Sequence, residues 1–339
     1  MFTVSARLPA IFAVGLLLHS GRAVAQDNGR VLEFYKKIGV GWPNDLWQKH
    51  LYGWMSYVSF SPDGTVVASD GPATPEDVAG NLKLWSFPEG RLIKKLPAKV
   101  TAISPDWKYY TTSAGIADME TGRLTITPGK NAYADYVFSP DGHYVAEARL
   151  RGGHALRILE LPSGKLVSAF GRNGVSDAAI SPDGQIVATG YWDLVVLWRL
   201  STGERLASLR GFNRWAGNLR FSPDGGLLAG GTDTGGIQVW DVHSRSRRFS
   251  LDVEGQVSDL EFSPDGKLVA AGTYGTGTVW LIDVSSGKLV DHQRVSDMGC
   301  GSIAFSPDGR FLITPSTGGL ITWPYDQGGT VRVFSVKPR

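Results

Sequence analysis

Carboxylates at regular positions are the side chains of this 339-residue chain that are best placed for chemistry. An acidic or amide residue stands four positions before a recurring Ser-Pro-Asp-Gly sequence at four places: Asp135, Asp177, Asn218 and Asp259. At the matching positions of other repeats the chain has uncharged residues: Tyr57, Val100 and Ser302. Paired carboxylates with a raised pKa could act as acid and base, but these groups could equally accept hydrogen bonds from loop amides. A partial acidic rim and a structural role both remain open.

Aromatic side chains in the loops form the second chemically informative group. Trp, Tyr and Arg dominate the binding hot spots of protein interfaces. We therefore predict a partner-binding site with these residues: Trp47, Trp192, Trp215, Trp323, Tyr325, Arg214, Asp177 and Asp259. The alternative is that many of these rings only fill the mouth of the fold. Three other tryptophans fall within apolar strands and are predicted to pack inside the protein: Trp85, Trp198 and Trp240.

Motifs for metals and cofactors are missing from the sequence. The chain has no Cys-x-x-Cys-His, no His-Glu-x-x-His and no glycine-rich phosphate loop between a strand and a helix. The histidines beyond residue 25 are widely separated: His50, His143, His154, His243 and His292. We expect no metal, no cofactor and no catalytic residue.

The elements that must position these side chains are set by the Ser-Pro-Asp-Gly turn. It begins at Ser61, Ser139, Ser181, Ser222, Ser263 and Ser306, and Ser104-Pro105-Asp106-Trp107 is an altered seventh copy. Pro fixes φ, Asp bonds to backbone donors, and Gly adopts the left-handed conformation that such a turn needs. Seven copies at a spacing of 35 to 43 residues indicate a repeat protein.

Apolar segments around each turn predict four short strands per repeat. One segment precedes the turn, a second follows it, a third often ends in an aromatic residue, and a fourth follows a Gly/Ser/Thr-rich turn. The expected fold is all-β: a seven-bladed β-propeller of four-stranded antiparallel blades.

The chain resembles the WD-repeat β-propeller family over about residues 30–336. The resemblance is carried by the Ser-Pro-Asp-Gly turns, by Trp240-Asp241 at the end of a third strand, and by a period near 42. It implies that the starts of the first strands approach a ligand face. No repeat has the family's Gly-His pair, and Gly211-Phe212 stands there in the fifth repeat, so the His–Asp–Ser/Thr–Trp network is incomplete. TolB-like propellers share the turn but commonly have six blades, and are the alternative.

The two ends of the chain are expected to meet in one blade. The seventh repeat has strands near residues 301–305, 310–314 and 330–336, after which no fourth strand follows. Residues 30–38 look like a fourth strand without a blade of their own. We predict that this N-terminal strand completes the last blade and covers an open sheet edge.

The first 25 residues have the features of a secretory signal peptide. Arg7 provides a positive start, residues 10–18 are apolar, and Ala23-Val24-Ala25 is a small-x-small cleavage site before Gln26. The apolar stretch is shorter than the roughly 20 residues that span a bilayer. We therefore expect an exported protein, periplasmic or extracellular, with residues 26–339 forming a single propeller and no integral membrane association.

Charge and cysteine content exclude further classes. Removing residues 1–25 takes away Arg7 and Arg22 and lowers the net charge from +2 to zero. Nucleic-acid binding needs a basic patch, which is missing here. Cys300 is the single cysteine, so there is no internal disulfide and its thiol is either buried or available to another chain.

The sequence favours a non-enzymatic protein- or peptide-binding scaffold that works as a monomer. One alternative is a propeller enzyme, lactonase-like or hydrolytic, with carboxylates at the mouth of the central channel. The other is carbohydrate binding through tryptophan rings, for which no repeated sugar-site motif is found.

Overall fold

Strands are the regular elements of the residues that the structure describes. The computed structural model describes residues 31–38, 57–70, 81–96, 100–112, 114–127, 134–149, 156–171, 174–212, 215–296, 299–316 and 330–337. Over these ranges no helix is long and apolar enough to cross a membrane. The predicted signal peptide lies outside them.

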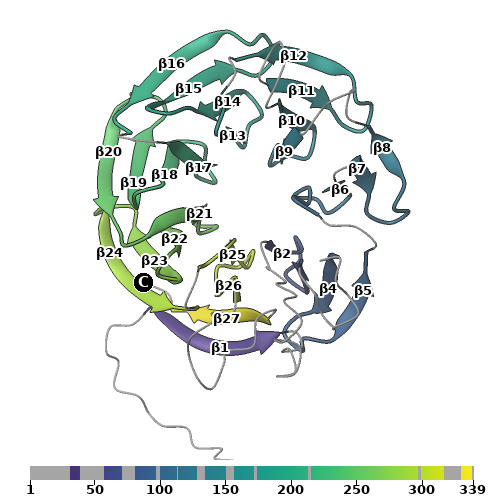
Figure 1. Cartoon of the computed structure of the whole chain (residues 1–339), viewed down its shortest axis with the longest axis vertical. Helices are drawn as coiled ribbons and strands as arrows, with labels where there is room; N and C mark the ends of the chain where they lie inside the picture. The colour runs from purple at the N-terminus through teal and green to yellow at the C-terminus, as the bar shows by residue number, and fades with distance from the viewer. Residues whose placement is uncertain are drawn as a thin grey trace, which may run out of the picture. The chain divides into compact units, whose positions relative to one another are not determined.

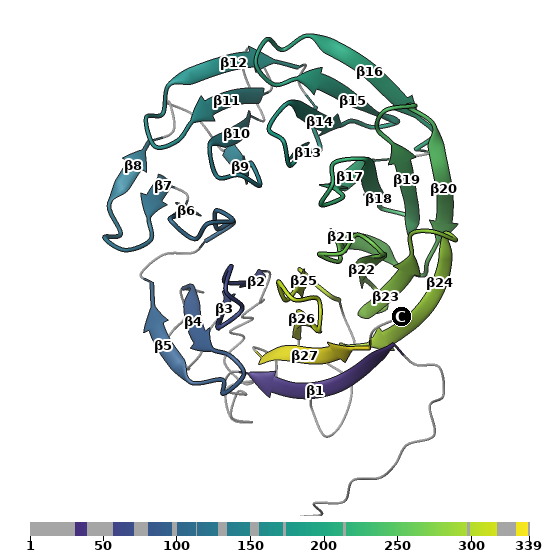
Figure 2. The same cartoon turned by 180° about the vertical axis from the view of Figure 1, so that it is seen from behind.

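Seven antiparallel sheets follow one another around a ring within the unit Val31–Arg339, as Figures 1 and 2 show from opposite sides. Blade 1 consists of β2 (Val58–Phe60), β3 (Val66–Ser69), β4 (Lys83–Ser86) and β5 (Leu92–Lys95). Blade 2 consists of β6 (Tyr109–Thr112), β7 (Gly115–Asp118) and β8 (Leu124–Ile126). Blade 3 consists of β9 (Ala134–Phe138), β10 (Tyr144–Arg149), β11 (Leu156–Glu160) and β12 (Leu166–Phe170). The expected seven-bladed β-propeller is confirmed.

The remaining four blades complete the ring. Blade 4 consists of β13 (Asp177–Ile180), β14 (Ile186–Gly190), β15 (Leu194–Arg199) and β16 (Arg205–Arg210). Blade 5 consists of β17 (Ala216–Phe221), β18 (Leu227–Thr232), β19 (Gly236–Asp241) and β20 (Arg247–Asp252). Blade 6 consists of β21 (Gln256–Phe262), β22 (Leu268–Tyr274), β23 (Thr278–Asp283) and β24 (Lys288–Arg294). Blade 7 consists of β25 (Ala304–Phe305), β26 (Phe311–Ser316), β27 (Thr330–Val336) and β1 (Leu32–Ile38).

Blade 2 differs from the prediction of four strands in every blade. Its sheet has three strands, and Ile103 forms only an isolated bridge to Tyr110 where the other blades have a first strand. This is the blade with the altered turn, in which Trp107 takes the left-handed conformation (φ 56°) that Gly adopts elsewhere. A residue with a side chain is strained there, which fits the shortened pairing beside it.

The Ser-Pro-Asp-Gly turns have one geometry in all seven copies. In blade 5 the Ser222 hydroxyl donates to Asp224 Oδ1 at 2.5 Å and accepts from the Leu227 amide at 2.9 Å. Asp224 Oδ1 also accepts from the Gly226 amide at 3.0 Å, and the Gly225 amide donates to the Ser222 carbonyl at 2.8 Å. Each turn therefore satisfies its own polar groups within a few residues.

The N-terminal strand completes the last blade, as predicted. β1 pairs antiparallel with β27, from Leu32 opposite Val336 to Ile38 opposite Val331, and the purple and yellow strands lie side by side in Figure 1. Asp291 of β24 fixes the start of this strand, because its Oδ2 accepts from the Val31 and Leu32 amides at 2.6 and 2.7 Å. Blade 6 thus holds the strand that closes blade 7.

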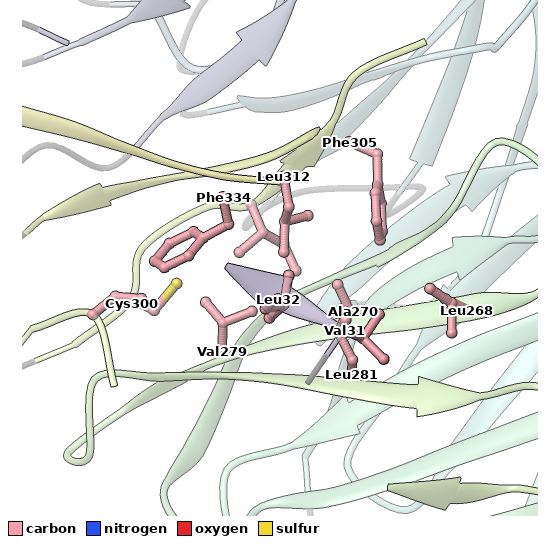
Figure 3. Packing of buried hydrophobic residues seen from close by; sticks show 12 residues of the cluster. Val31, Leu32, Leu268, Ala270, Val279, Leu281, Cys300, Phe305, Leu312 and Phe334 are labelled. Carbon is pink, nitrogen blue, oxygen red and sulfur yellow. The ribbon is translucent and has the colours of Figure 1, made fainter. Parts of the chain in front are cut away.

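The hydrophobic core is divided among the seams between blades. Seven clusters of buried residues each combine side chains from two neighbouring blades, including the seam between blades 7 and 1. Figure 3 shows Val31 and Leu32 among side chains of blades 6 and 7. Because each seam needs both of its blades, the core closes only when the ring does.

Candidate functional site

Two of the predicted partner-binding tryptophans lie together on one face of the propeller. In an antiparallel blade the first and third turns share one face, here named the turn face after the Ser-Pro-Asp-Gly turns, and the other connections lie on the opposite loop face. Trp192 belongs to the β14–β15 connection of blade 4 and Trp215 directly precedes β17 of blade 5. The Ala216 amide donates to the Tyr191 carbonyl at 3.0 Å, which ties these two loops together.

The two rings contact each other edge to face, and both residues are exposed to water. Their centroids are 6.1 Å apart with an interplanar angle of 81°. Trp192 is 62% exposed and Trp215 is 46% exposed. Such an arrangement of aromatic rings is favourable, yet about half of the surface of the two residues stays available to a partner. We name these two residues the tryptophan pair.

A polar pocket of about 200 Å³ adjoins Trp215 between blades 4, 5 and 6. Its lining residues are Ser176, Asp177, Trp215, Gly217, Asn218, Gly231, Thr232, Asp233, Gln256 and Val257. Asp177 and Trp215, both predicted site residues, are therefore brought to one place. Trp85, Trp198 and Trp240 instead pack in the seams, as expected.

Asn218 occupies a strained position in the wall of this pocket. Its φ is 52°, in the left-handed region, where the pairing of β17 with β18 shifts between Gly217 and Arg220. Its Nδ2 donates to the Val257 carbonyl of blade 6 at 2.9 Å. Bulges and left-handed residues of this kind redirect side chains and are common beside functional sites.

The predicted acidic residues Asp177 and Asp259 connect neighbouring blades. Asp177 Oδ2 accepts from the Leu219 amide of blade 5 at 2.6 Å, and Asp259 Oδ2 accepts from the Ile303 amide of blade 7 at 3.0 Å. Each Asp also accepts, through its Oδ1, a hydrogen bond from the amide of the residue that follows it, Ala178 or Leu260. The hypothesis that these carboxylates accept hydrogen bonds from backbone amides is thus correct for both residues. Asp177 additionally lines the pocket.

A serine before each of these aspartates makes the second half of the same connection. The Ser176 hydroxyl donates to the Ala216 carbonyl, and the Ser258 hydroxyl donates to the Cys300 carbonyl. We name each Ser–Asp pair a latch. The sequence carries this signal as Val-Ser-Asp at residues 175–177 and 257–259, which our sequence reasoning missed because it considered the Asp alone.

The residue opposite each latch aspartate is a glycine, for a steric reason. Gly190 pairs with Asp177 and Gly272 with Asp259. A Cβ at Gly190 would lie 2.2 Å from the Ala216 carbonyl oxygen, and one at Gly272 would lie 2.7 Å from Cys300 Sγ. The next blade therefore approaches too closely for any other residue.

Asp259 is also part of a charged network on the inner strands. Arg220 Nη2 lies 2.8 Å from Asp259 Oδ1, and Glu261 Oε2 accepts from the Phe305 amide at 3.1 Å. Burial, and then repulsion by Asp259, raise the pKa of Glu261 to about 8. Burial also raises the pKa of Asp177, against which the positive charge of Arg220 acts. The Arg220 side chain nevertheless keeps 42% of its exposure, so water reaches this network.

Tyr57 connects blade 1 to blade 2, as the latch aspartates connect their neighbouring blades. Its hydroxyl accepts from the Ile103 amide of blade 2 at 3.1 Å, and burial raises its pKa to about 12. The side chain of Asp135 lies outside the described residues.

Other predicted features can be placed only in part. Trp47, Arg214, Trp323 and Tyr325 lie outside the described residues. Cys300 is fully buried, its Sγ is 2.8 Å from Thr314 Oγ1, and burial raises the pKa of its thiol to about 12. Of the two expectations for this thiol, burial is correct. Among the described residues, no group of three or more His, Cys, Asp or Glu side chains is arranged to hold a metal ion.

Comparison with known proteins agrees with this architecture. The model of the WD domain, G-beta repeat, matches residues 164–198, 203–241 and 247–283. Three WD repeats are thus part of this seven-bladed β-propeller. Each match begins near the outer strand of one blade and ends with the third strand of the next, and the three together contain every residue that lines the pocket.

Several WD-repeat proteins are similar to part of this chain. Cross-pathway control WD-repeat protein 2 of Flammulina velutipes is 31% identical over 37% of this chain and 42% of that protein. Small ribosomal subunit protein RACK1 of Schizosaccharomyces pombe is 28% identical over 36% of this chain and 41% of its own length. WD repeat-containing protein SL1-17 of Schistosoma mansoni is 33% identical over 36% and 40%. The chain thus spans less than half the length of these relatives.

The WD-repeat network of blade 5 lacks, besides the His that the sequence showed to be missing, the Ser/Thr partner of its tryptophan. Trp85 Nε1 donates to Ser69 Oγ at 2.9 Å, and Trp198 Nε1 donates to Thr189 Oγ1 at 2.7 Å. The matching strand position beside Trp240 is Gly230, and within the described structure the Trp240 indole N–H has no hydrogen-bond partner. The Leu219 and Phe212 side chains fill this space, since a Cβ on Gly230 would lie 3.0 Å from the first and 3.1 Å from the second.

Proposed function

We propose that this WD-repeat propeller is a non-enzymatic scaffold that binds a protein or peptide through its loop face. The observation that carries the proposal is the tryptophan pair: two large rings, 62% and 46% exposed, in contact with each other on that face. Exposed clusters of this kind mark interaction sites, and Trp is among the residue types that contribute most to binding.

The polar surroundings of the pair support the same proposal. Hot spots combine apolar anchors with a few positioned polar groups, and the pocket beside Trp215 provides hydroxyl, amide and carboxylate groups. That Trp47, Trp323, Tyr325 and Arg214 belong to the same site stays a prediction from the sequence. One relative is named as a small ribosomal subunit protein, and a role within an assembly is consistent with our proposal.

We also propose that the protein acts outside the cytoplasm as a monomer. The support is the sequence pattern of Arg7, the apolar residues 10–18 and the Ala23-Val24-Ala25 site. N-terminal sequencing of protein from the periplasmic or culture fraction should begin at Gln26. Retention of Met1 on protein recovered from that fraction would contradict this part.

Affinity capture from extract of the producing cells tests the scaffold proposal. Trp192→Ala and Trp215→Ala should each weaken retention of the same captured partner by about 2 kcal/mol, roughly 30-fold. Ile93→Ala is the matched control, because Ile93 is 57% exposed but lies on the outer strand β5. Equal retention by all three variants would reject the loop face as the partner site.

A catalytic role for the inner carboxylates is the second candidate. Glu261 beside Asp259, with its pKa raised to about 8, is the kind of pair that acid–base chemistry uses. Both carboxylates, however, already accept backbone amides of blade 7. Turnover of an ester or lactone that disappears in Glu261→Gln would favour this candidate over the scaffold.

A further inference from the structure

The pocket beside Trp215 has the size and charge of a site for one side chain. Pockets for whole small molecules usually measure about 300–1,000 Å³, and this one measures about 200 Å³. Among the described residues that line it, the charged ones are Asp177 and Asp233, and none is basic. Its electrostatic field therefore favours a cation.

Asp177 can still accept further hydrogen bonds in its present arrangement. Its Oδ1 accepts from the Ala178 amide and its Oδ2 from the Leu219 amide. An ionised carboxylate has about four acceptor positions, so these two bonds hold the group in place and leave capacity for a ligand. Arg220, the nearby inner-strand cation, is paired with Asp259 and does not line the pocket.

Trp215 provides the second element of cation recognition. Its pyrrole edge lies over Gly217: a Cβ built there would be 3.7 Å from Trp215 Cδ1 and 4.0 Å from Asp177 Cβ. Gly217 therefore lies between the Trp215 ring and the Asp177 side chain, where the absence of its own side chain leaves room for a ligand group. A guanidinium group can stack on an aromatic ring while donating to a carboxylate in its plane.

We propose that this pocket binds a basic side chain of the partner protein, arginine in preference to lysine, between the Trp215 ring and the Asp177 and Asp233 carboxylates. This rests on the proposed scaffold function and adds the chemistry by which the partner is recognised. The tryptophan pair supplies the apolar contact around the cation, and the pocket supplies the charge. Binding should weaken as salt rises, because exposed charge interactions are screened.

Titration with two small probes tests the chemistry without any knowledge of the partner. N-acetyl-arginine amide should shift the indole N–H resonances of Trp215 and Trp192, whereas N-acetyl-citrulline amide, a neutral analogue of the same shape, should bind about tenfold more weakly. Equal binding of both probes would overturn the proposal. So would tighter binding of a neutral methyl glycoside, which would assign the pocket to a sugar.

A blocking variant ties the binding to this pocket. Gly217→Val places methyl groups between Trp215 and Asp177, and the Cβ itself meets only ordinary contacts. Gly226→Val is the matched control on the turn face of the same blade, where the nearest contact is an Asp224 oxygen at 3.4 Å. Gly217→Val should abolish the arginine-amide shifts with melting unchanged, and Gly226→Val should keep them. Shifts that persist in Gly217→Val would reject the pocket.

Parallel capture experiments separate this proposal from the scaffold function. If the Trp215→Ala variant loses its partner but the wild-type protein does not distinguish arginine amide from citrulline amide, the scaffold function stands and the cation proposal fails. If arginine amide binds as expected while partner capture is unaffected by Trp215→Ala and Gly217→Val, the pocket chemistry stands and the scaffold proposal fails.

Discussion

Hydrogen bonds within the Ser-Pro-Asp-Gly turns are local, whereas those of the latches on the inner strands join neighbouring blades. Each Ser-Pro-Asp-Gly turn bonds side chains to groups two to five residues away, as Ser222 does with Asp224 and Leu227. The latches bond residues about 40 positions apart: Asp177 to Leu219 and Asp259 to Ile303. The Ser-Pro-Asp-Gly turns therefore stabilise single blades, and the latches help to hold neighbouring blades together.

The carboxylates of the turns and those of the inner strands also differ in their response to acid. In the turns, the Ser61 and Ser222 hydroxyls lower the pKa of Asp63 and Asp224, so these carboxylates favour folding when ionised. On the inner strands the pKa of Glu261 is raised, so its ionisation opposes folding. The Ser and Asp side chains of the turns form hydrogen bonds within their own turn, while the loop face exposes the tryptophan pair and its pocket.

Removal of the closing strand β1 should have the largest effect, because it destabilises the whole ring. Deletion of residues 31–38 takes away the buried Val31 and Leu32, the bonds to Asp291, and the cover of β27. We expect a loss comparable to the whole stability of a domain, at least about 5 kcal/mol, with aggregation through the open edge. Denaturant unfolding and size-exclusion chromatography measure this.

Glu33→Ala is the control for the closing strand, because it removes only the exposed Glu33–Lys337 ion pair. A shortened protein that stayed monomeric with unchanged unfolding would show that blade 7 does not need β1.

Breaking one latch should lower the free energy of unfolding more than breaking an exposed ion pair does. Asp259→Ala leaves Arg220 without its ion-pair partner and removes the acceptor for the Ile303 and Leu260 amides. We expect a loss of about 3 kcal/mol in the free energy of unfolding. Asp193→Ala, which breaks the exposed pair with Arg210, should cost less than about 1 kcal/mol. Equal losses in the two variants would remove the distinction between latch and surface pair.

Glu261 should make stability fall as pH rises from about 4.5 to about 8. In this window Glu261 is ionised in the unfolded chain and protonated in the folded protein. Loss of the proton therefore stabilises the unfolded state relative to the folded state. Glu261→Gln removes this effect and keeps an oxygen that can accept from the Phe305 amide. The variant should gain about 1–3 kcal/mol relative to wild type between pH 5 and pH 9.

Urea unfolding at both pH values measures this gain, with the exposed Glu254→Gln as control. An identical pH dependence in wild type and Glu261→Gln would mean that Glu261 ionises normally in the folded protein.

A single turn should matter least. Asp224→Ala removes the acceptor for the Ser222 hydroxyl and the Gly226 amide, at a cost of about 1 kcal/mol. The lost contribution is present above the ordinary pKa of Asp and disappears as pH falls through the lowered pKa of Asp224, so wild type and variant should converge in acid. Calorimetric melting at neutral and acidic pH would reveal a persistent difference if this account were wrong.

The fold could be predicted from the sequence because its residue pattern repeats. The candidate site could be predicted only in part, because it depends on residues that do not recur from repeat to repeat. The turns, the blade number and the closing strand follow from local residue chemistry that recurs seven times. Blade 2 is the shortest repeat and has Trp107 where the other turns have Gly, and both features are visible in the sequence. That Ile103 pairs only through an isolated bridge to Tyr110 was not visible there. Trp192 and Trp215 were recognised by residue type, but their contact and the pocket depend on three blades meeting.

The role of the aspartates could not be settled from the sequence for a similar reason. Asp177 and Asp259 bond amides more than 40 residues away, and those distances become short only when the ring closes. The glycines opposite them, Gly190 and Gly272, are a sequence signal for this close approach that becomes readable once the pairing is known.

The central claim, that the exposed tryptophan pair of the loop face binds a partner while the turn residues serve stability alone, is tested most directly by measuring stability and partner affinity on the same samples of Trp215→Ala and Asp224→Ala. We predict that Trp215→Ala loses about 2 kcal/mol of binding with unfolding changed by less than about 0.5 kcal/mol. Asp224→Ala should lose stability and keep its affinity. If Trp215→Ala instead unfolds more readily while its folded fraction binds the partner as wild type does, the ring is a plug of the fold and the claim is contradicted.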